Sequence, residues 1–280
     1  FSGTVRLIGT GNVRLNGTAG SDLASFDLGT RTLSARNGGT YKLGSLTGEA
    51  GSILTIASYT SGVTFSIGAS NQSSAFPGVI SNGSGTTSVI KAGTGTLTLS
   101  GASTYSGSTS VNAGELSVTG SLGGTAVTVA SGATLSGTGS IGGAVSVSGS
   151  LAPGPAAGTL SVASLQINPS GALIMDVAPS GDKINVTGNL AFGDVPVVLV
   201  TVSEYRAEMR DVNRVIEDLT EVYDNLSIVD WHAITDEAPA DAQGHLLGVV
   251  STILGAIKDR LACAYVSRAS GTPTHTLRID

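Results

Sequence analysis

The stretch KAGTGTLTLSGASTYSGSTSVNAGEL, residues 91–116, decides the fold of this chain. Within it, Leu97 and Leu99 alternate with threonines, so aliphatic side chains lie on one face and hydroxyls on the other, as a half-buried strand requires. The same alternation returns in Val127-Thr-Val129 and Val145-Ser-Val147. The pattern predicts many short β-strands joined by tight turns.

A glycine marks the turns at a regular interval. Gly114, Gly132, Gly149 and Gly171 each precede a small or polar residue and then an aliphatic one. A period of about 20 residues suits one rung of a β-helix with two or three strands, and glycine reaches the positive φ that a sharp corner needs. We therefore expect a single-stranded parallel β-helix (β-solenoid) over residues 1–194, with roughly ten rungs and a length on the order of 45–50 Å.

The composition agrees with a mainly β fold. The chain has 40 glycines among 280 residues, with only 12% charged and 4% aromatic residues, whereas an ordinary domain has about 25% charged residues and about 7% glycine. No apolar run reaches the roughly 18 residues of a membrane-spanning helix. A β-sandwich remains an alternative, because alternation and glycine turns occur there too. A disordered linker is disfavoured by the mean hydropathy of +0.27.

Charge and periodicity both change near residue 194. Residues 1–194 hold seven Lys/Arg and seven Asp/Glu, whereas residues 195–280 hold seven and thirteen, so the net charge of −6 lies in the second part. There the sequence predicts strands over 195–201 and 226–230 and helices over 206–223 and 246–265, with the two strands parallel. We expect a small acidic α/β segment over 195–280, which is a cap on the solenoid, part of a second domain or a foreign fusion.

Residues 76–194 resemble a known family. The stretch 91–116 closely resembles the autotransporter-associated β-strand repeat, residues 123–143 continue it, and residues 76–83 resemble the segment upstream of such repeats. The resemblance implies the passenger region of a Gram-negative type V secretion system, built as a parallel β-helix. Such passengers act as adhesins or as stalks that display other domains, and they are mostly not enzymes.

The expected function is therefore that of a structural or interaction module, secreted or exposed at the cell surface. The resemblance places it at the outer membrane of a Gram-negative bacterium, held there only through a β-barrel that this chain does not carry. Other proteins or cell-surface glycans are the expected partners, and end-to-end self-association is possible through open rung edges. The net charge of −6 argues against nucleic acid, because no basic patch could release counterions from phosphates.

Residues 195–265 resemble the C-terminal end of an SGNH-type hydrolase or acyltransferase domain. The resemblance implies that His245 would be the base and Asp241 the acid that orients it. This gives the alternative function, an SGNH-like esterase or O-acyltransferase fragment fused to a β-helical stalk. The sequence holds no Gly-Asp-Ser block for the nucleophile, and Asp241 and His245 are separated by three residues, whereas the family has two. We therefore expect no enzyme.

The remaining polar residues indicate no cofactor and no metal. His232, His245 and His275 lack the spacing of metal ligands, and Cys263 stands alone. The acidic residues near position 240 are expected to form a solvated loop, because they lack the ordered pattern of a calcium loop. The sequence 93–95, Gly-Thr-Gly, precedes no helical pattern and is predicted to be a turn.

Overall fold

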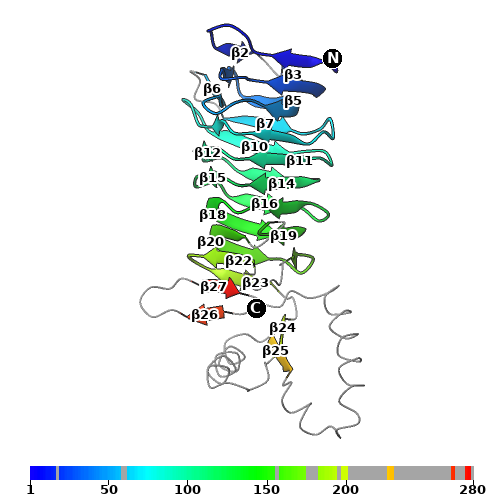
Figure 1. The fold of residues 1–280 in the computed structure, drawn as a ribbon, viewed down its shortest axis with the longest axis vertical. Helices are drawn as coiled ribbons and strands as arrows, with labels where there is room; N and C mark the ends of the chain where they lie inside the picture. The colour runs from blue at the N-terminus through cyan, green and yellow to red at the C-terminus, as the bar shows by residue number, and fades with distance from the viewer. Residues whose placement is uncertain are drawn as a thin grey trace, which may run out of the picture.

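The computed structural model describes residues 1–16, 19–57, 62–154, 158–174 and 182–193, together with the backbones of four strands at 197–200, 226–229, 266–268 and 275–278. Every regular element among these residues is a strand. The strands stack along one long axis into a parallel β-solenoid (Figure 1). The predicted mainly β fold and β-helix are therefore confirmed.

One sheet of 15 strands runs the length of the rod. All the pairings that lead from its first strand, β1, to β22 are parallel. Its members are β1 (Thr4–Arg6), β3 (Gly20–Asp27), β5 (Gly39–Thr47), β7 (Val63–Ile67), β10 (Thr87–Lys91), β12 (Ala102–Ser103), β13 (Thr109–Val111), β15 (Ser121–Leu122), β16 (Val127–Val129), β18 (Ser140–Val147), β20 (Thr159–Ile167), β22 (Lys183–Val186), β23 (Leu190–Phe192), β26 (Val266–Arg268) and β27 (His275–Arg278).

Two smaller parallel sheets complete the walls of the rod. The six-stranded sheet contains β8 (Ser74–Phe76), β11 (Thr96–Leu99), β14 (Glu115–Val118), β17 (Thr134–Ser136), β19 (Ser150–Ala152) and β21 (Ala172–Leu173). The four-stranded sheet contains β2 (Val13–Leu15), β4 (Thr32–Ala35), β6 (Ile53–Ile56) and β9 (Val79–Ile80). In the middle of the rod one rung consists of three strands, as in β13, β14 and β15, before β16 returns to the wall of β13.

Long strands bend around a corner and so belong to two walls. The first part of β18 pairs with β15 at Ser140–Ile141, and its second part pairs with β16 at Val145–Val147. The strand β20 behaves likewise, pairing with β22 through its first residues and with β23 through its last. This is why one sheet covers two sides of the rod.

Apolar side chains stack in register inside the rod. The parallel pairing aligns five buried leucines of the six-stranded sheet in one column: Leu97, Leu116, Leu135, Leu151 and Leu173. Removing a large aliphatic side chain such as Leu from water contributes about 1.5–3 kcal/mol, so repeated columns supply most of the stability of the rod. Among the described residues, the buried aromatic side chains are those of Phe26, Tyr41, Phe65, Phe76 and Tyr105, and the fully buried hydrophobic side chains beyond Tyr105 are aliphatic.

The rungs of the solenoid differ in length. Thr109 pairs with Val127, and Val127 pairs in turn with Val145, at intervals close to the predicted period. In contrast, Val63 pairs with Thr87 and Ile53 pairs with Val79, and both of these intervals are longer. The extra residues lie in the corners, and the ten strands stacked from β1 to β22, about 4.8 Å apart, span about 43 Å, close to the predicted length.

The marker glycines occupy the corners before the six-stranded sheet, as predicted. Gly114 precedes β14 and has a φ of 60°. A Cβ atom there would lie 2.6 Å from the carbonyl oxygens of Gly93 and Gly95 in the preceding rung. The corner therefore requires glycine both for its backbone conformation and for the close approach of the neighbouring corner.

The second part of the chain contributes four described strands. β24 (Val197–Val200) and β25 (Leu226–Val229) form a parallel pair, which confirms the two strands predicted there. β27 pairs with the edge of β22 in the antiparallel direction, and β26 extends the sheet beyond it. The helices predicted over 206–223 and 246–265 lie outside the described residues, and the boundary near residue 194 stays a prediction.

Candidate functional site: an outer column and buried polar clamps

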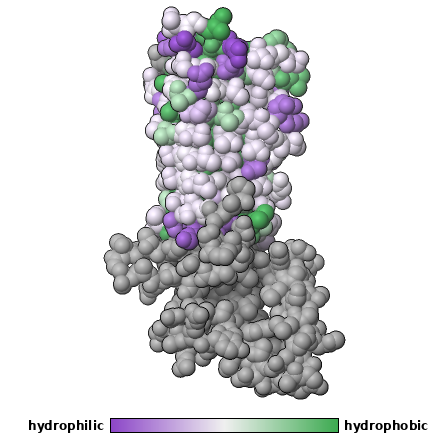
Figure 2. Space-filling view, viewed as in Figure 1, coloured by the Kyte–Doolittle hydropathy of each residue, from purple (hydrophilic) through white to green (hydrophobic). Residues whose placement is uncertain are grey.

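A column of side chains runs along the outside of the long sheet and is uncharged from Ser66 onward, where Lys42 is the preceding register partner. The pairing places its members directly above one another, and all are at least partly exposed: Ser66, Ile90, Ser110, Thr128, Ser146 and Gln166. We call this set the outer column. Residues 58–175 contain only two charged side chains, Lys91 and Glu115. The middle of the rod therefore presents weakly polar surface, and Figure 2 shows mostly pale residues there.

Lys91 lies inside the rod although it is charged. It pairs with Ile67 on one side and with Val111 on the other, within a column whose other members are aliphatic. Its side chain is 1% exposed, and its Nζ atom donates hydrogen bonds to the carbonyl oxygens of Ala92 at 2.8 Å, Gly93 at 2.7 Å and Ala113 at 3.0 Å. The stem thus replaces an apolar residue while three backbone carbonyls hold the ammonium group.

Burial lowers the pKa of Lys91 to about 8, and the negative charge of Glu115 opposes this shift. Desolvation disfavours the charged form of an amine, whereas hydrogen bonds to carbonyl oxygens favour it. An ammonium group has three donors, and the three carbonyls use all of them. The site is therefore matched to the protonated amine.

A second buried polar group joins Tyr105, Thr109 and Thr125. The Tyr105 hydroxyl lies 2.7 Å from Oγ1 of Thr109, which lies 2.9 Å from Oγ1 of Thr125. Thr125 in turn donates to the carbonyl oxygen of Gly107. Burial raises the pKa of Tyr105 to about 12, and the hydrogen bonds with Thr109 and Thr125 offset part of the rise. Thr109 occupies a position whose neighbours above and below, Val89 and Val127, are aliphatic.

Glu115 forms a third link on the outer side of the six-stranded sheet. Its Oε2 atom accepts a hydrogen bond from Thr96 at 3.1 Å, and its Oε1 atom accepts one from Ser136. Thr96 and Ser136 belong to the preceding and following rungs, in β11 and β17. We call Lys91, the Tyr105–Thr109–Thr125 group and Glu115 the polar clamps.

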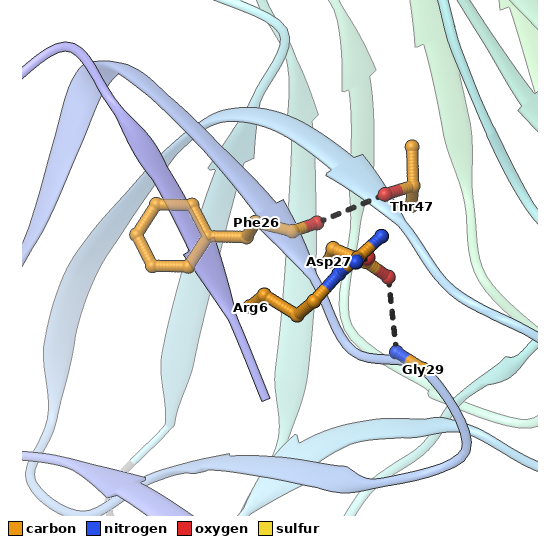
Figure 3. A network of polar contacts seen from close by, with 5 residues as sticks. All are labelled: Arg6, Phe26, Asp27, Gly29 and Thr47. Atoms are coloured by element: carbon orange, nitrogen blue, oxygen red, sulfur yellow. Dashed lines mark hydrogen bonds and ion pairs between the residues drawn. The ribbon is translucent and has the colours of Figure 1, made fainter. Parts of the chain in front are cut away.

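An ion pair links the first two rungs. Nε of Arg6 lies 2.7 Å from Oδ2 of Asp27, and the backbone N–H of Gly29 donates to Oδ1 at 3.1 Å (Figure 3). The hydrogen bond from Arg6 and then that from Gly29 lower the pKa of Asp27. The Arg6 side chain is 72% exposed, so this pair contributes little to stability.

No group of three or more potential metal ligands from His, Cys, Asp and Glu occurs within the described part of the chain. No helix there is long and apolar enough to cross a membrane. Asp241 and His245, the residues named by the SGNH-type resemblance, lie outside the described residues, as does His232. His275 belongs to β27, of which only the backbone is described.

Sequence reasoning missed the polar clamps. In the sequence, Lys91 is counted only among the charged residues, and Tyr105 appears only within the stretch that resembles the family. One signal was available for Lys91, because it follows Val89 by two residues and so shares its inward face in an alternating strand. The carbonyl partners could not be found in this way, since Ala113 reaches Lys91 only through the pairing of β10 with β13.

Comparison with known families bears on the same region. Residues 89–118 match the passenger-associated transport repeat. The matched stretch contains Lys91, Tyr105, Thr109 and Glu115 and lies in the middle of the parallel β-solenoid. The match and the fold together support an autotransporter passenger β-helix, a class that is typically structural. No curated protein matches the chain. The comparisons do not show the SGNH-type resemblance.

Proposed function

We propose that this chain is a secreted or surface-exposed rod that serves in adhesion or display, as part of a type V passenger of a Gram-negative bacterium. The observation that carries the proposal is the outer column, a row of mainly hydroxyl and amide side chains in register on one face of the rod. The match to the passenger-associated transport repeat supports the class of protein.

The chemistry of the outer column favours an uncharged, hydroxyl-rich partner. Hydroxyl and amide groups both donate and accept hydrogen bonds, as do the hydroxyls of a neutral glycan. Each such bond contributes only about 0.5–1.5 kcal/mol net, because water is displaced from both partners. A rigid row that repeats about every 4.8 Å offers many contacts at once, and linked contacts bind more tightly than single ones.

Charge argues against other partners for this face. The only charged residues between positions 58 and 175 are Lys91 and Glu115, and Lys91 is buried. A nucleic acid or a sulfated polymer needs a cationic surface, and the one lysine next to the outer column, Lys42, is paired with Asp22. We therefore take neutral cell-surface glycans as the partner class.

The test is binding of the purified full chain to a panel of neutral and anionic glycans at low and high salt. We expect binding to neutral glycans with little dependence on salt. The double variant Thr128→Lys/Ser146→Lys places two charges in adjacent rungs of the outer column and should abolish binding. Thr98→Lys/Ser117→Lys places two charges in adjacent rungs of the six-stranded sheet and should leave binding intact. Absence of binding to any neutral glycan, or equal loss in both variants, would rule out adhesion through this column.

A further inference from the structure

The inner columns of the rod do not by themselves define which residues pair. On the inward face of the long sheet, the positions aligned with Lys91 are Ile67, Val111, Val129, Val147 and Ile167. A shift of one strand by two residues keeps aliphatic side chains inside and hydroxyls outside. Apolar packing has no direction, so such a shift changes the free energy little in repetitive, glycine-rich strands.

The polar clamps behave differently, because each needs partners at one register only. If the strand of Lys91 shifted by two residues against its neighbour, Ala113 would no longer accept from Nζ, and a buried ammonium group would lose a partner. A shift at Thr109 would separate it from Thr125. Leaving buried polar or charged groups unpaired costs far more than rearranging aliphatic contacts.

The clamps are concentrated in one part of the rod. Lys91 links its own rung to Ala113 in the next, and Thr109 connects onward to Thr125. Glu115 spans the rungs of Thr96 and Ser136. Apart from Thr125 and Ser136, every residue of the clamps lies within the matched repeat at 89–118.

The strands that follow contain aliphatic residues at the corresponding inward positions. In β16, β18 and β20 these are Val127, Val129, Val145, Val147, Leu165 and Ile167. Each of these rungs pairs with the one before it, so a rung whose register is fixed helps to fix the next. Two further polar links lie farther along the rod: Asn168 donates to Ser146 and Ser148, and the buried Asp182 accepts from the backbone N–H of Gly158.

We propose that the matched repeat is the register-setting element of this solenoid, with Lys91 as its main positioning residue. The clamps select one pairing between the strands β10, β13 and β16. The rungs that follow, whose inward side chains are aliphatic, then align with the rungs that the clamps have fixed. The passenger-associated transport repeat in this chain thus acts in folding, in addition to any contact its surface makes.

Disulfide trapping after refolding tests the proposal, in a Cys263→Ser background so that the introduced pair holds the only thiols. Ile90→Cys/Ser110→Cys reports the native register of β10 against β13, and Ser110→Cys/Thr128→Cys that of β13 against β16, because each pair lies across strands about 4.8 Å apart, within the Cα separation of a disulfide. Ile90→Cys/Ser108→Cys and Ser110→Cys/Ala126→Cys report the same two pairings shifted by two residues, because their Cα atoms are about 8 Å apart in the native pairing, too far for a disulfide.

With Lys91 present, we expect refolding under oxidising conditions to trap the native pair only. Lys91→Met keeps a long unbranched stem but removes the ammonium group, and we expect it to raise trapping of the shifted Ile90→Cys/Ser108→Cys pair at least about tenfold. Val111→Ala is the matched control: it occupies the same inner column in the next rung and destabilises the rod without removing a polar group of any clamp. It should leave the ratio of native to shifted trapping unchanged.

A second variant serves if Lys91→Met fails to fold. Thr109→Val replaces the hydroxyl by a methyl group of the same shape, at a position flanked by Val89 and Val127, and should raise trapping of the shifted Ser110→Cys/Ala126→Cys pair. Equal trapping ratios in the parent, Lys91→Met, Thr109→Val and Val111→Ala would overturn the proposal, and so would an increase in Val111→Ala alone.

Discussion

The Nζ atom of Lys91 lies 3.0 Å from the carbonyl oxygen of Ala113, a residue of the next rung. The same atom contacts the carbonyl oxygens of Ala92 and Gly93 in its own corner. One buried cation therefore joins the corners of two successive rungs from inside the rod. The side chains aligned with Lys91 in the inner column are aliphatic and have no donor to offer these carbonyls.

Replacing Lys91 with methionine should destabilise the rod. The variant keeps most of the stem in the inner column but leaves three carbonyl oxygens without their donor, and unpaired buried acceptors cost about 1–3 kcal/mol. Urea unfolding followed by circular dichroism measures the loss. Ser117→Ala, on the outer face of β14, is the control and should change stability by less than about 0.5 kcal/mol. A loss no larger than that of the control would show that the carbonyls find other donors.

The stability difference between the parent and Lys91→Met should depend on pH. The pKa of Lys91 is about 8 in the folded chain, below its ordinary value of 10.5. Between these values the unfolded chain binds the proton and the folded chain does not, so the contribution of Lys91 to folding rises with pH. Below about pH 8 both states are protonated and the difference is flat. Parallel urea titrations from neutral pH to the ordinary lysine pKa check this, and a difference that stays flat or shrinks would mean that the carbonyls outweigh burial.

The sequence predicts the repetitive features of the rod because they are local. Alternation at Leu97, Leu99 and Val127 requires only that side chains point to opposite faces of a strand, and the corner at Gly114 requires only a backbone conformation. The parallel pairing of 197–200 with 226–229 follows equally from two apolar runs separated by a long connection.

The polar clamps and the variation in rung length escape prediction because they depend on register. Lys91 can be buried only because the corner that contains Ala113 stacks on the corner next to Lys91. That contact joins positions far apart in the sequence. The rung length also varies, since the interval from Ile53 to its partner Val79 is longer than that from Thr109 to Val127. A mean period estimated from the spacing of glycines cannot reveal how the length of individual rungs varies. Asp241 and His245 lie outside the described residues, so their predicted roles remain predictions.

Gly114→Ala should be among the most damaging single-methyl changes in the rod. The substitution forces a residue with φ of 60° to carry a Cβ atom, which costs about 1–2 kcal/mol even in open space. Here the Cβ atom would also lie 2.6 Å from two carbonyl oxygens, so the corners must separate. Gly124→Ala is the control, because a Cβ atom at Gly124 meets nothing within 4 Å. Thermal unfolding should separate the two variants, and equal midpoints would contradict the corner argument.

The ion pair between Arg6 and Asp27 should matter little and only above acidic pH. Asp27 has a pKa below its ordinary value of 3.8, so its contribution is present above that value and is lost as pH falls through the folded pKa. Because Arg6 is largely exposed, Arg6→Ala should cost about 0.2–1 kcal/mol at low salt and less at high salt. Unfolding of the parent and the variant at two ionic strengths measures this, and an effect that grows with salt would be inconsistent with an ion pair.

A serine-hydrolase probe should leave the chain unlabelled. His245 could deprotonate a serine only if a nucleophile and oxyanion donors stood beside it, and the sequence holds no Gly-Asp-Ser block to supply the nucleophile. The fluorophosphonate reaction of the full chain, with intact-mass readout, should therefore show no added mass. His245→Ala and Asp241→Ala are the control variants, because labelling of a serine that these residues activate requires the base. Labelling of the parent that disappears in His245→Ala would establish the acyl-transfer alternative, whereas labelling that persists in both variants would indicate a serine that reacts without this base.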